Sequence, residues 1–247
     1  MSSLSLISLN IEKDKHFDQV LPFLESKQSE IACFMEVFEA DVPKLEHACH
    51  GTAVFAAMNK QENPRGVMAL GITIVSRLPL TNIRIAYYAG PEGDPGLFDD
   101  RDMYTKFATM RYLVLLVTVE KGSQLFRIAT THFPWTPKGV VADFQRMALI
   151  KLGKALAEEG ELILCGDFNA PRGGEIFTGL ASTWKDNIPL EYQASLDPAL
   201  HKAGQEVADK MVDGLFTTPY YRATGVELIS GLSDHCAVTA TIERSEA

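Results

Sequence analysis

Side chains that bind cations or transfer protons stand at the ends of several apolar runs in this sequence. Asn10 ends "SLISLN", Glu36 follows "IACFM", and His132 ends "RIATTH". The same pattern occurs in "LILCGDFN", in "MVDGLF" and at "LSDH", which precedes the final apolar run. If these ends meet at one edge of a fold, their carboxylates repel one another and favour a hard divalent cation, because oxygen ligands suit Mg²⁺ or Mn²⁺.

Such a cluster has a use in phosphate-ester chemistry. A divalent cation screens the charge of the phosphate and stabilises the charge that develops in the transition state. A carboxylate beside a histidine raises the basicity of the imidazole and fixes its tautomer, so that the pair handles protons. Each of these residues alone has an ordinary structural explanation, as a turn residue, an ion-pair partner or a core histidine. The prediction of a site therefore depends on all the segments meeting.

The hydrophobic pattern predicts more strands than helices. The run "LSLISLNI" alternates polar and apolar residues, and "MRYLVLLVTVE" and "QLFRIATTHF" flank the turn sequence Lys-Gly-Ser, which is typical of a hairpin. Helical periodicity predicts helices over residues 14–27, 40–49 and 140–159, the first of them capped by Asp14. Strands in hairpins, with helices between the groups, favour two packed sheets with helices outside over a doubly wound parallel sheet.

The composition is that of a globular protein. The 247 residues are 46% hydrophobic and 22% charged, without a Gly/Ser-rich or Pro-rich linker, so we expect a single domain over residues 1–247. The net charge of −9 argues against a nucleic-acid coat protein or a polybasic membrane binder, since phosphate neutralisation needs basic residues. The sequence leads to no prediction of oligomeric state.

Cysteine spacing and the N-terminal residues indicate the cellular compartment in which the protein is expected to act. The four cysteines are scattered without a C-x-x-C pair, which indicates neither a zinc site nor a disulfide framework. The first residues lack the basic region and the small-residue cleavage site of a signal peptide, and no apolar run has the length of a membrane span. We therefore expect a cytoplasmic protein that does not act at a membrane.

Six segments in order, "SLNI", "FMEV", "TTHF", "CGDFNAP", "MVDGLF" and "LSDHCAV", resemble the motifs of the endonuclease/exonuclease/phosphatase (DNase I-like) superfamily. The resemblance extends from about residue 4 to residue 242. It implies a four-layer α/β sandwich, in which two packed, mostly antiparallel sheets are flanked by helices. It also implies a divalent-metal-dependent phosphoesterase that cleaves phosphodiesters by in-line attack of water, with a nuclease as the most familiar outcome.

The resemblance assigns the cation to three residues. Glu36 is expected to be the principal ligand of Mg²⁺ or Mn²⁺, with Asn10 beside it. Asp234 stands where the family often has a second metal contact. The family's usual L-Q-E is replaced here by "FMEV", so the glutamine is missing although the glutamate is kept.

Five further residues match catalytic positions of the family. Asp167 is expected to orient or deprotonate the attacking water, and Asn169 to hold that water or a phosphoryl oxygen. His235 is expected to contact the scissile phosphate or to act as general base, oriented by Asp213. His132 is expected to stabilise the phosphorane or to protonate the leaving group.

Three more residues are candidates for contacts with substrate. Arg111 resembles a phosphate-contacting arginine of some members, and Trp135 stands where a pocket wall is expected. Arg172 in "NAPRGG" is either a surface charge or a side chain that leans over the rim towards a phosphate; the sequence leaves both interpretations open.

The substrate is the least specified part of the prediction. The expected partner is a phosphate ester, and nucleic acid is one candidate. A phosphomonoesterase or a small-molecule phosphodiesterase fits the acidic chain at least as well as a nuclease of long DNA. A catalytically inactive binding module of the same fold is a further alternative. A calcineurin-like metallophosphatase is disfavoured, because its G-N-H-[DE] motif does not occur in the sequence.

Overall fold

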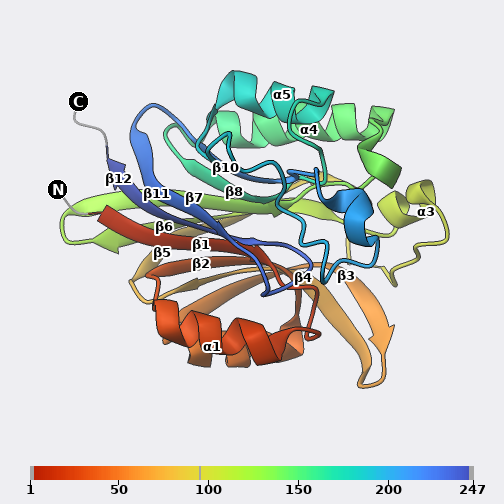
Figure 1. Ribbon diagram of the computed structural model, residues 1–247, viewed down its shortest axis with the longest axis horizontal. Helices are drawn as coiled ribbons and strands as arrows, with labels where there is room; N and C mark the ends of the chain where they lie inside the picture. Colours follow the sequence, from red (N-terminus) through yellow and green to blue (C-terminus); the bar gives the residue numbers. More distant parts are fainter. Residues whose placement is uncertain (1–2, 95, 245–247) are drawn as a thin grey trace.

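Two sheets that pack face to face form the centre of the molecule, and helices cover both outer faces. The computed structural model describes residues 3–94 and 96–244; residues 1, 2, 95 and 245–247 of the expected domain lie outside the described residues. In Figure 1 the sheets lie between helix α1 on one side and helices α4 and α5 on the other. This arrangement confirms the four-layer α/β sandwich.

The first sheet joins strands from both ends of the chain. In spatial order its strands are β11 (Tyr221–Ile229), β12 (Ala237–Arg244), β1 (Ser3–Asn10), β2 (Ile31–Phe38), β4 (Gly66–Ser76) and β3 (Thr52–Asn63). Strands β1 and β2 run parallel, and the other neighbours are antiparallel.

The second sheet is built from the middle of the chain. In spatial order its strands are β5 (Leu80–Ala89), β6 (Tyr112–Lys121), β7 (Gln124–His132), β8 (Ile163–Asp167), β10 (Asp213–Thr217) and β9 (Lys185–Asp186). Only β7 and β8 run parallel among these described pairs. The sheets are therefore mostly antiparallel, as expected.

The two parallel pairs explain why distant polar residues share one edge. Parallel strands end at the same edge of a sheet, so β1 and β2 bring their C-terminal ends together, as do β7 and β8. Strand β12 is antiparallel to β1, and β10 is antiparallel to β8, so both begin where their partners end. We call this common edge of the two sheets the rim.

Helices α1, α2 and α4 lie where the hydrophobic pattern indicated, with shifted ends, whereas α3 and α5 were not predicted. Helix α1 covers Phe17–Lys27, α2 Val42–Cys49, α3 Met103–Ala108, α4 Asp143–Ala157 and α5 Glu175–Thr183, and short 3₁₀ helices are η1 (Glu39–Asp41), η2 (Pro137–Gly139) and η3 (Gly204–Val207). The prediction that Asp14 caps α1 was wrong, because the helix begins three residues later and Asp14 pairs with Arg65 at 3.1 Å. The predicted start of the second helix at residue 40 falls in η1 instead.

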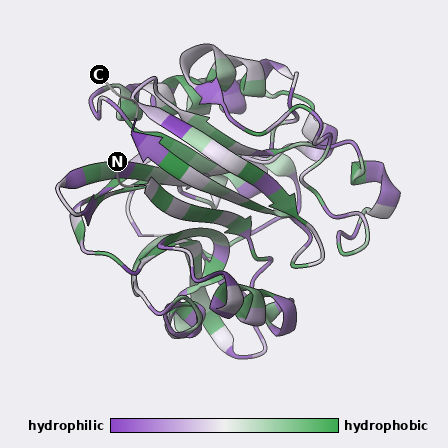
Figure 2. Ribbon diagram, turned by 60° about the vertical axis from the view of Figure 1, so that its left-hand side comes forward, coloured by the Kyte–Doolittle hydropathy of each residue, from purple (hydrophilic) through white to green (hydrophobic). Residues whose placement is uncertain are grey.

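Hydrophobic side chains fill the space between the sheets. Strands β1 and β2 of the first sheet pack against β8 of the second, and buried aliphatic and aromatic residues of both sheets form one continuous core. Figure 2 shows hydrophobic colours concentrated on the central strands. The four cysteines are buried and free.

Candidate active site

The strand register brings His132 and Asp167 level with each other at the rim. In the parallel pairing of β7 with β8, His132 lies opposite Asp167, and His132 Nε2 is 3.3 Å from Asp167 Oδ2. This close pairing requires glycine before the aspartate. Gly166 has a φ of 143°, and a Cβ there would lie 2.0 Å from the backbone oxygen of Thr131. The Gly-Asp of "CGDFN" is therefore a structural requirement of the site.

Asp167 is a buried carboxylate surrounded by N–H donors. Asn10 Nδ2 donates to its Oδ2 at 3.2 Å, and the backbone N–H of Asn169 donates to its Oδ1 at 2.8 Å. Burial alone would raise the pKa of Asp167, but the charge of His235 and the hydrogen bond and charge of His132 outweigh it and lower the pKa to about 2. Asp167 is therefore an anion that accepts hydrogen bonds and a weak base.

His235 lies between two carboxylates. Its Nδ1 is 2.8 Å from Asp213 Oδ2, and its Nε2 is 3.7 Å from Asp167 Oδ2. Burial opposes a charge on the imidazole, but Asp213 and Asp167 prevail and raise its pKa well above the usual value. Both ring nitrogens of His235 therefore face carboxylates, which favour the protonated imidazole.

Asp213 and His235 are fixed by a loop that the sequence did not single out. The hydroxyl of Ser195 accepts hydrogen bonds from the backbone N–H groups of Val212 and Asp213, both at 3.0 Å. The Ser195 carbonyl accepts from the N–H of Cys236 at 2.7 Å, and Leu196 forms an isolated bridge with His235. Ser195 is fully buried and holds both partners in place. "QASLDP" carries no signal in the sequence that would have revealed this role.

Glu36 stands on a β-bulge. The register between β2 and β4 shifts between Phe34 and Val37, and Glu36 has a left-handed φ of 58°. A bulge re-aims a side chain at the cost of local backbone strain, and such strain is found at functional sites. Asn169 has a similar φ of 49°, and its Nδ2 donates to the carbonyl of Phe133 at 2.9 Å.

Asp234 belongs to a second group of carboxylates at the rim. Desolvation, followed by the charges of Glu12 and Glu36, raises its pKa to about 6, although His235 acts in the opposite direction. Glu12 in turn pairs with Lys15 and with His16, whose Nε2 lies 3.0 Å from the carboxylate. The sequence analysis missed Glu12, although it stands only two residues after Asn10.

The donor chemistry of this second group fits a hard cation. Asp234 and Glu36 repel each other, and Asn10 Oδ1 accepts one bond from the Glu12 N–H at 3.2 Å and keeps a second lone pair. Oxygen donors with uncompensated negative charge are the ligands that Mg²⁺ and Mn²⁺ prefer. The atoms of Asp167, Asp213 and His235 also lie within 4.8 Å of one another, but each is already hydrogen-bonded within the site.

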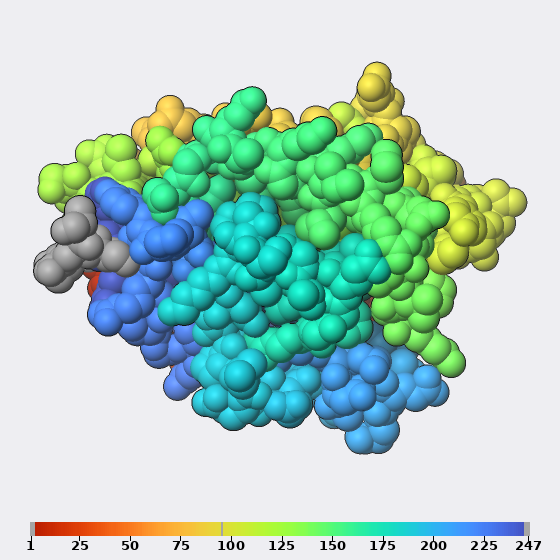
Figure 3. Space-filling view, turned by 90° about the horizontal axis from the view of Figure 1, so that it is seen from above, coloured from red at the N-terminus to blue at the C-terminus, as the bar shows by residue number. Residues whose placement is uncertain are grey.

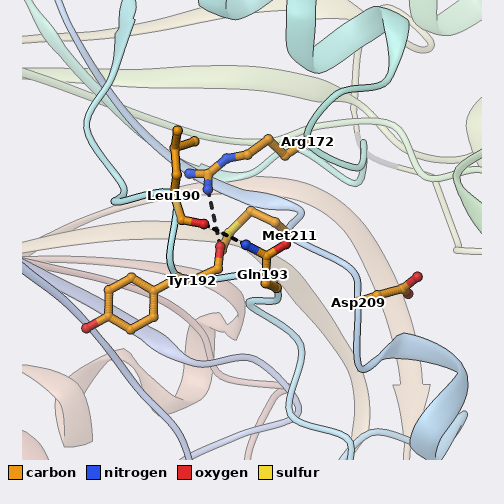
Figure 4. A pocket seen from close by; sticks show the side chains of 6 residues that line it. All are labelled: Arg172, Leu190, Tyr192, Gln193, Asp209 and Met211. Carbon is orange, nitrogen blue, oxygen red and sulfur yellow. Dashed lines mark hydrogen bonds between the residues drawn. The ribbon is translucent and has the colours of Figure 1, made fainter.

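Arg111 and Arg172 differ in their surroundings. The guanidinium of Arg111 lies 3.7 Å from the ring centroid of Tyr87, and its buried Nε has no partner among the described residues. Arg172 is tied to Asp186 at 2.8 Å and to the carbonyl of Ile188 at 2.9 Å. Figure 4 shows its side chain directed into a cavity of about 280 Å³, towards the backbone of Tyr192. Arg172 therefore has a structural role. It is neither a free surface charge nor directed over the rim towards a phosphate.

The fold and the rim define a class of protein: α/β sandwiches that carry carboxylates, amides and imidazoles at one edge of two packed sheets. The sequence profile of the Endonuclease/Exonuclease/phosphatase family matches residues 7–239. The chain belongs to this family, whose members are phosphoesterases. No curated protein sequence matches the chain at a significant level.

Solved structures show the same fold. The endonuclease/exonuclease/phosphatase from Bacteroides vulgatus has a TM-score of 0.74 and 15% identity, covering 99% of this chain and 100% of the other. The mannosyl-6-phosphatase of Bacteroides thetaiotaomicron has a TM-score of 0.69 and 12% identity, covering 98% and 100%. ANGEL2, a 2′,3′-cyclic phosphatase, has a TM-score of 0.70 and 13% identity, covering 97% and 95%.

Proposed function

We propose that the protein is a divalent-metal-dependent phosphoesterase that hydrolyses phosphodiesters by in-line attack of water. The observation that carries the proposal is the Asp167 carboxylate, which is held by N–H donors from β1, β7 and the segment after β8, beside the Asp213–His235 pair. These groups come from segments up to 157 residues apart in sequence. An ion pair with only a structural role would not require groups from several distant segments to meet at one carboxylate.

Glu36, Asp234 and Asn10 would hold the cation, which supplies charge neutralisation at the phosphate and the leaving oxygen. Asp167 orients the attacking water and takes up the proton that the water loses as its bond to phosphorus forms, although its low pKa makes it a weak base. Asn169, in its strained conformation, binds that water or a phosphoryl oxygen. Asp213 fixes His235 through Nδ1, so that Nε2 faces the reacting phosphate and offsets its negative charge.

His132 supplies the proton for the leaving group. Its Nε2 faces Asp167, and its buried Nδ1 has no hydrogen-bond partner in the described part of the chain. A buried ring nitrogen without a partner is costly unless a ligand completes it. Arg111, with its unpartnered Nε, is assigned to a phosphate contact by family position alone.

The substrate is proposed only as a phosphate ester. Two structural neighbours are named for action on a monoester and on a cyclic phosphate, so a phosphomonoesterase or a small-molecule phosphodiesterase is the second candidate. Nucleic acid remains one possible substrate. None of the described helices is long and apolar enough to cross a membrane. The cytoplasmic location expected from the sequence stays a prediction.

Hydrolysis of bis-p-nitrophenyl phosphate and of p-nitrophenyl phosphate, with Mg²⁺, Mn²⁺ or EDTA, tests the proposal. We expect metal-dependent release of nitrophenol that Asp167→Ala and His235→Ala abolish. Glu243→Gln is the control, because this carboxylate pairs with Arg222 near the far end of β12, away from the rim. Absence of turnover on both esters, together with no calorimetric binding of either metal, would show an inactive binding module instead.

A further inference from the structure

Lys106 lies in an aromatic setting without a carboxylate partner. Its Nζ is 4.7 Å from the ring centroid of Trp135 and 5.7 Å from that of Phe98. Within residues 3–94 and 96–244 it forms no ion pair. Lys44 offers a contrast, because its ammonium also lies over a ring, that of Phe17, but is paired with Asp41 at 3.0 Å.

The Lys106 ammonium lies near the rim, because Trp135 follows the end of β7 at His132 by three residues. Desolvation lowers the pKa of Lys106, while the negative charges of Glu36, Asp100 and Asp167 act in the opposite direction. A half-buried cation that is desolvated without a partner is unfavourable, and an incoming anion would offset this cost. Cation–π contacts with Trp135 and Phe98 compensate only part of it.

A second lysine reaches the same place from another segment. The Asp197 N–H donates to the Asp234 carbonyl at 2.8 Å, and the His201 N–H donates to the Asp197 carbonyl at 2.8 Å, so the segment that ends at Lys202 lies beside the rim. The charge of Lys202 also lowers the pKa of Lys106. Lys202 is exposed and precedes η3. Desolvation and the charge of His235 lower the pKa of the neighbouring His201, while Asp167 acts in the opposite direction. Figure 3 shows the segments around α3, after β7 and around η3 gathered at one end of the molecule.

Helix α3 holds Lys106 in a fixed position. Asp102 Oδ1 caps the helix by accepting hydrogen bonds from the N–H groups of Tyr104 and Thr105, at 2.8 and 2.9 Å. The Phe107 ring stacks on that of Phe144 in α4, with centroids 4.6 Å apart. The lysine is therefore pre-organised, which reduces the entropic cost of binding a ligand.

We propose that Lys106, Lys202 and the exposed face of Trp135 form an anion-binding subsite beside the rim, and that the natural substrate is a phosphate ester carrying a second anionic group. The inference rests on the proposed phosphoesterase function. Donors at the strand ends already serve the reacting phosphate, whereas both lysines stand on connections that flank the rim. Trp135, at 40% exposure, leaves ring surface for the part of the substrate between the two anionic groups.

The test compares two phosphonates that differ by one anionic group, methylenediphosphonate and methylphosphonate. Binding is followed by Trp135 fluorescence in a Trp184→Phe background, since the chain has two tryptophans. We expect the diphosphonate to bind at least about 10-fold more tightly than the monophosphonate. Lys106→Met should remove this preference, Lys202→Met should reduce it, Lys106→Arg should keep it, and Lys44→Met should not change it.

Hydrolysis of bis-p-nitrophenyl phosphate separates this inference from the proposed function. That ester has no second anionic group, so Lys106→Met should weaken binding of the diphosphonate by a larger factor than it lowers kcat/KM for the ester. Loss of turnover in Lys106→Met would show that the lysine contacts the reacting phosphate, and equal binding of the two phosphonates by the parent would also overturn the inference. A protein that prefers the diphosphonate but hydrolyses no ester would keep the subsite and lose the phosphoesterase.

Discussion

Two aspartates at the same rim have opposite electrostatic surroundings. Asp167, at the end of β8, is held by N–H donors and has a pKa of about 2. Asp234, before β12, is half-buried near Glu12 and Glu36 and has a pKa of about 6. One carboxylate is stabilised as an anion by groups of the protein itself. For the other, desolvation and the neighbouring carboxylates outweigh the compensation by His235.

The difference divides the rim into two halves with different needs. The half around Asp167, His132, Asp213 and His235 balances acidic groups with imidazoles and is complete without an added ion. The half around Glu36 and Asp234 carries negative charge that Lys15 and His235 offset only in part, since the pKa of Asp234 stays raised. We infer that the first half orients water and moves protons, and that the second holds the metal.

Removing the charge of Asp167 should have the largest effect on activity. Asp167→Asn keeps the shape of the side chain but can no longer act as an anionic acceptor for water or as the counter-charge of His235. We expect kcat to fall about 10³-fold while metal binding, measured by calorimetry, changes little. A variant that loses metal affinity to the same extent as activity would show that the two halves are not separate.

Asp213→Asn should have the second-largest effect on activity, because it changes the pKa of His235. Asp213 is the largest of the charges that raise the pKa of His235, so its removal should lower that pKa. If protonated His235 is the active form, activity declines as pH rises through its pKa, and this alkaline limb should move towards acid in the variant. The measurement is a profile of kcat/KM against pH. We also expect about a 10²-fold loss at the optimum.

General-base action by neutral His235 makes a different prediction for this profile. If neutral His235 were the active form, the acidic limb would move instead, and the variant would gain relative activity below neutral pH. An unmoved profile would contradict both forms of the mechanism, because it would separate Asp213 from the titration of His235.

The two packed sheets with helices outside followed from the sequence. The strand ends that carry Asn10, His132 and Asp167 meet as expected, because the two parallel pairs bring them to one edge, while the roles of these residues stay predictions. The local backbone conformations that position the site could not be predicted from the sequence. The bulge that turns Glu36 and the loop that brings Ser195 to Asp213 depend on cross-strand register, which alternation of residue types does not encode. The role of Arg172 also depended on its partner Asp186, which lies 14 residues further along the chain.

Asp234→Asn should raise the stability of the metal-free protein while it weakens metal binding. The folded-state pKa of Asp234 is raised from 3.8 to about 6, so its contribution is favourable at low pH and is lost as pH rises through about 6. The variant should therefore match the parent near pH 4. Near pH 7.5 it should be more stable by on the order of 1 kcal/mol, after allowance for solvent screening.

Thermal unfolding in EDTA at the two pH values measures this difference in stability. With Mg²⁺ the order should be reversed, so that the parent is more stable than the variant. The parent should gain more stability from the metal than the variant does, because the stabilisation by a ligand that binds the folded state increases with the logarithm of its affinity. Equal metal-induced shifts in both proteins would remove Asp234 from the cation site.

Glu12→Gln should have the smallest effect, and it tests whether the acidic half acts as a unit. Glu12 contributes, after desolvation, to the raised pKa of Asp234, so the substitution should lower that pKa below about 6. An NMR titration of the Asp234 carboxyl carbon measures the shift directly. Glu30→Gln is the matched control, since Glu30 also pairs with a lysine, Lys121, and is absent from the charges that act on Asp234. A pKa of Asp234 that stays the same in Glu12→Gln would leave burial and Glu36 as its causes and confine the acidic half to Glu36 and Asp234.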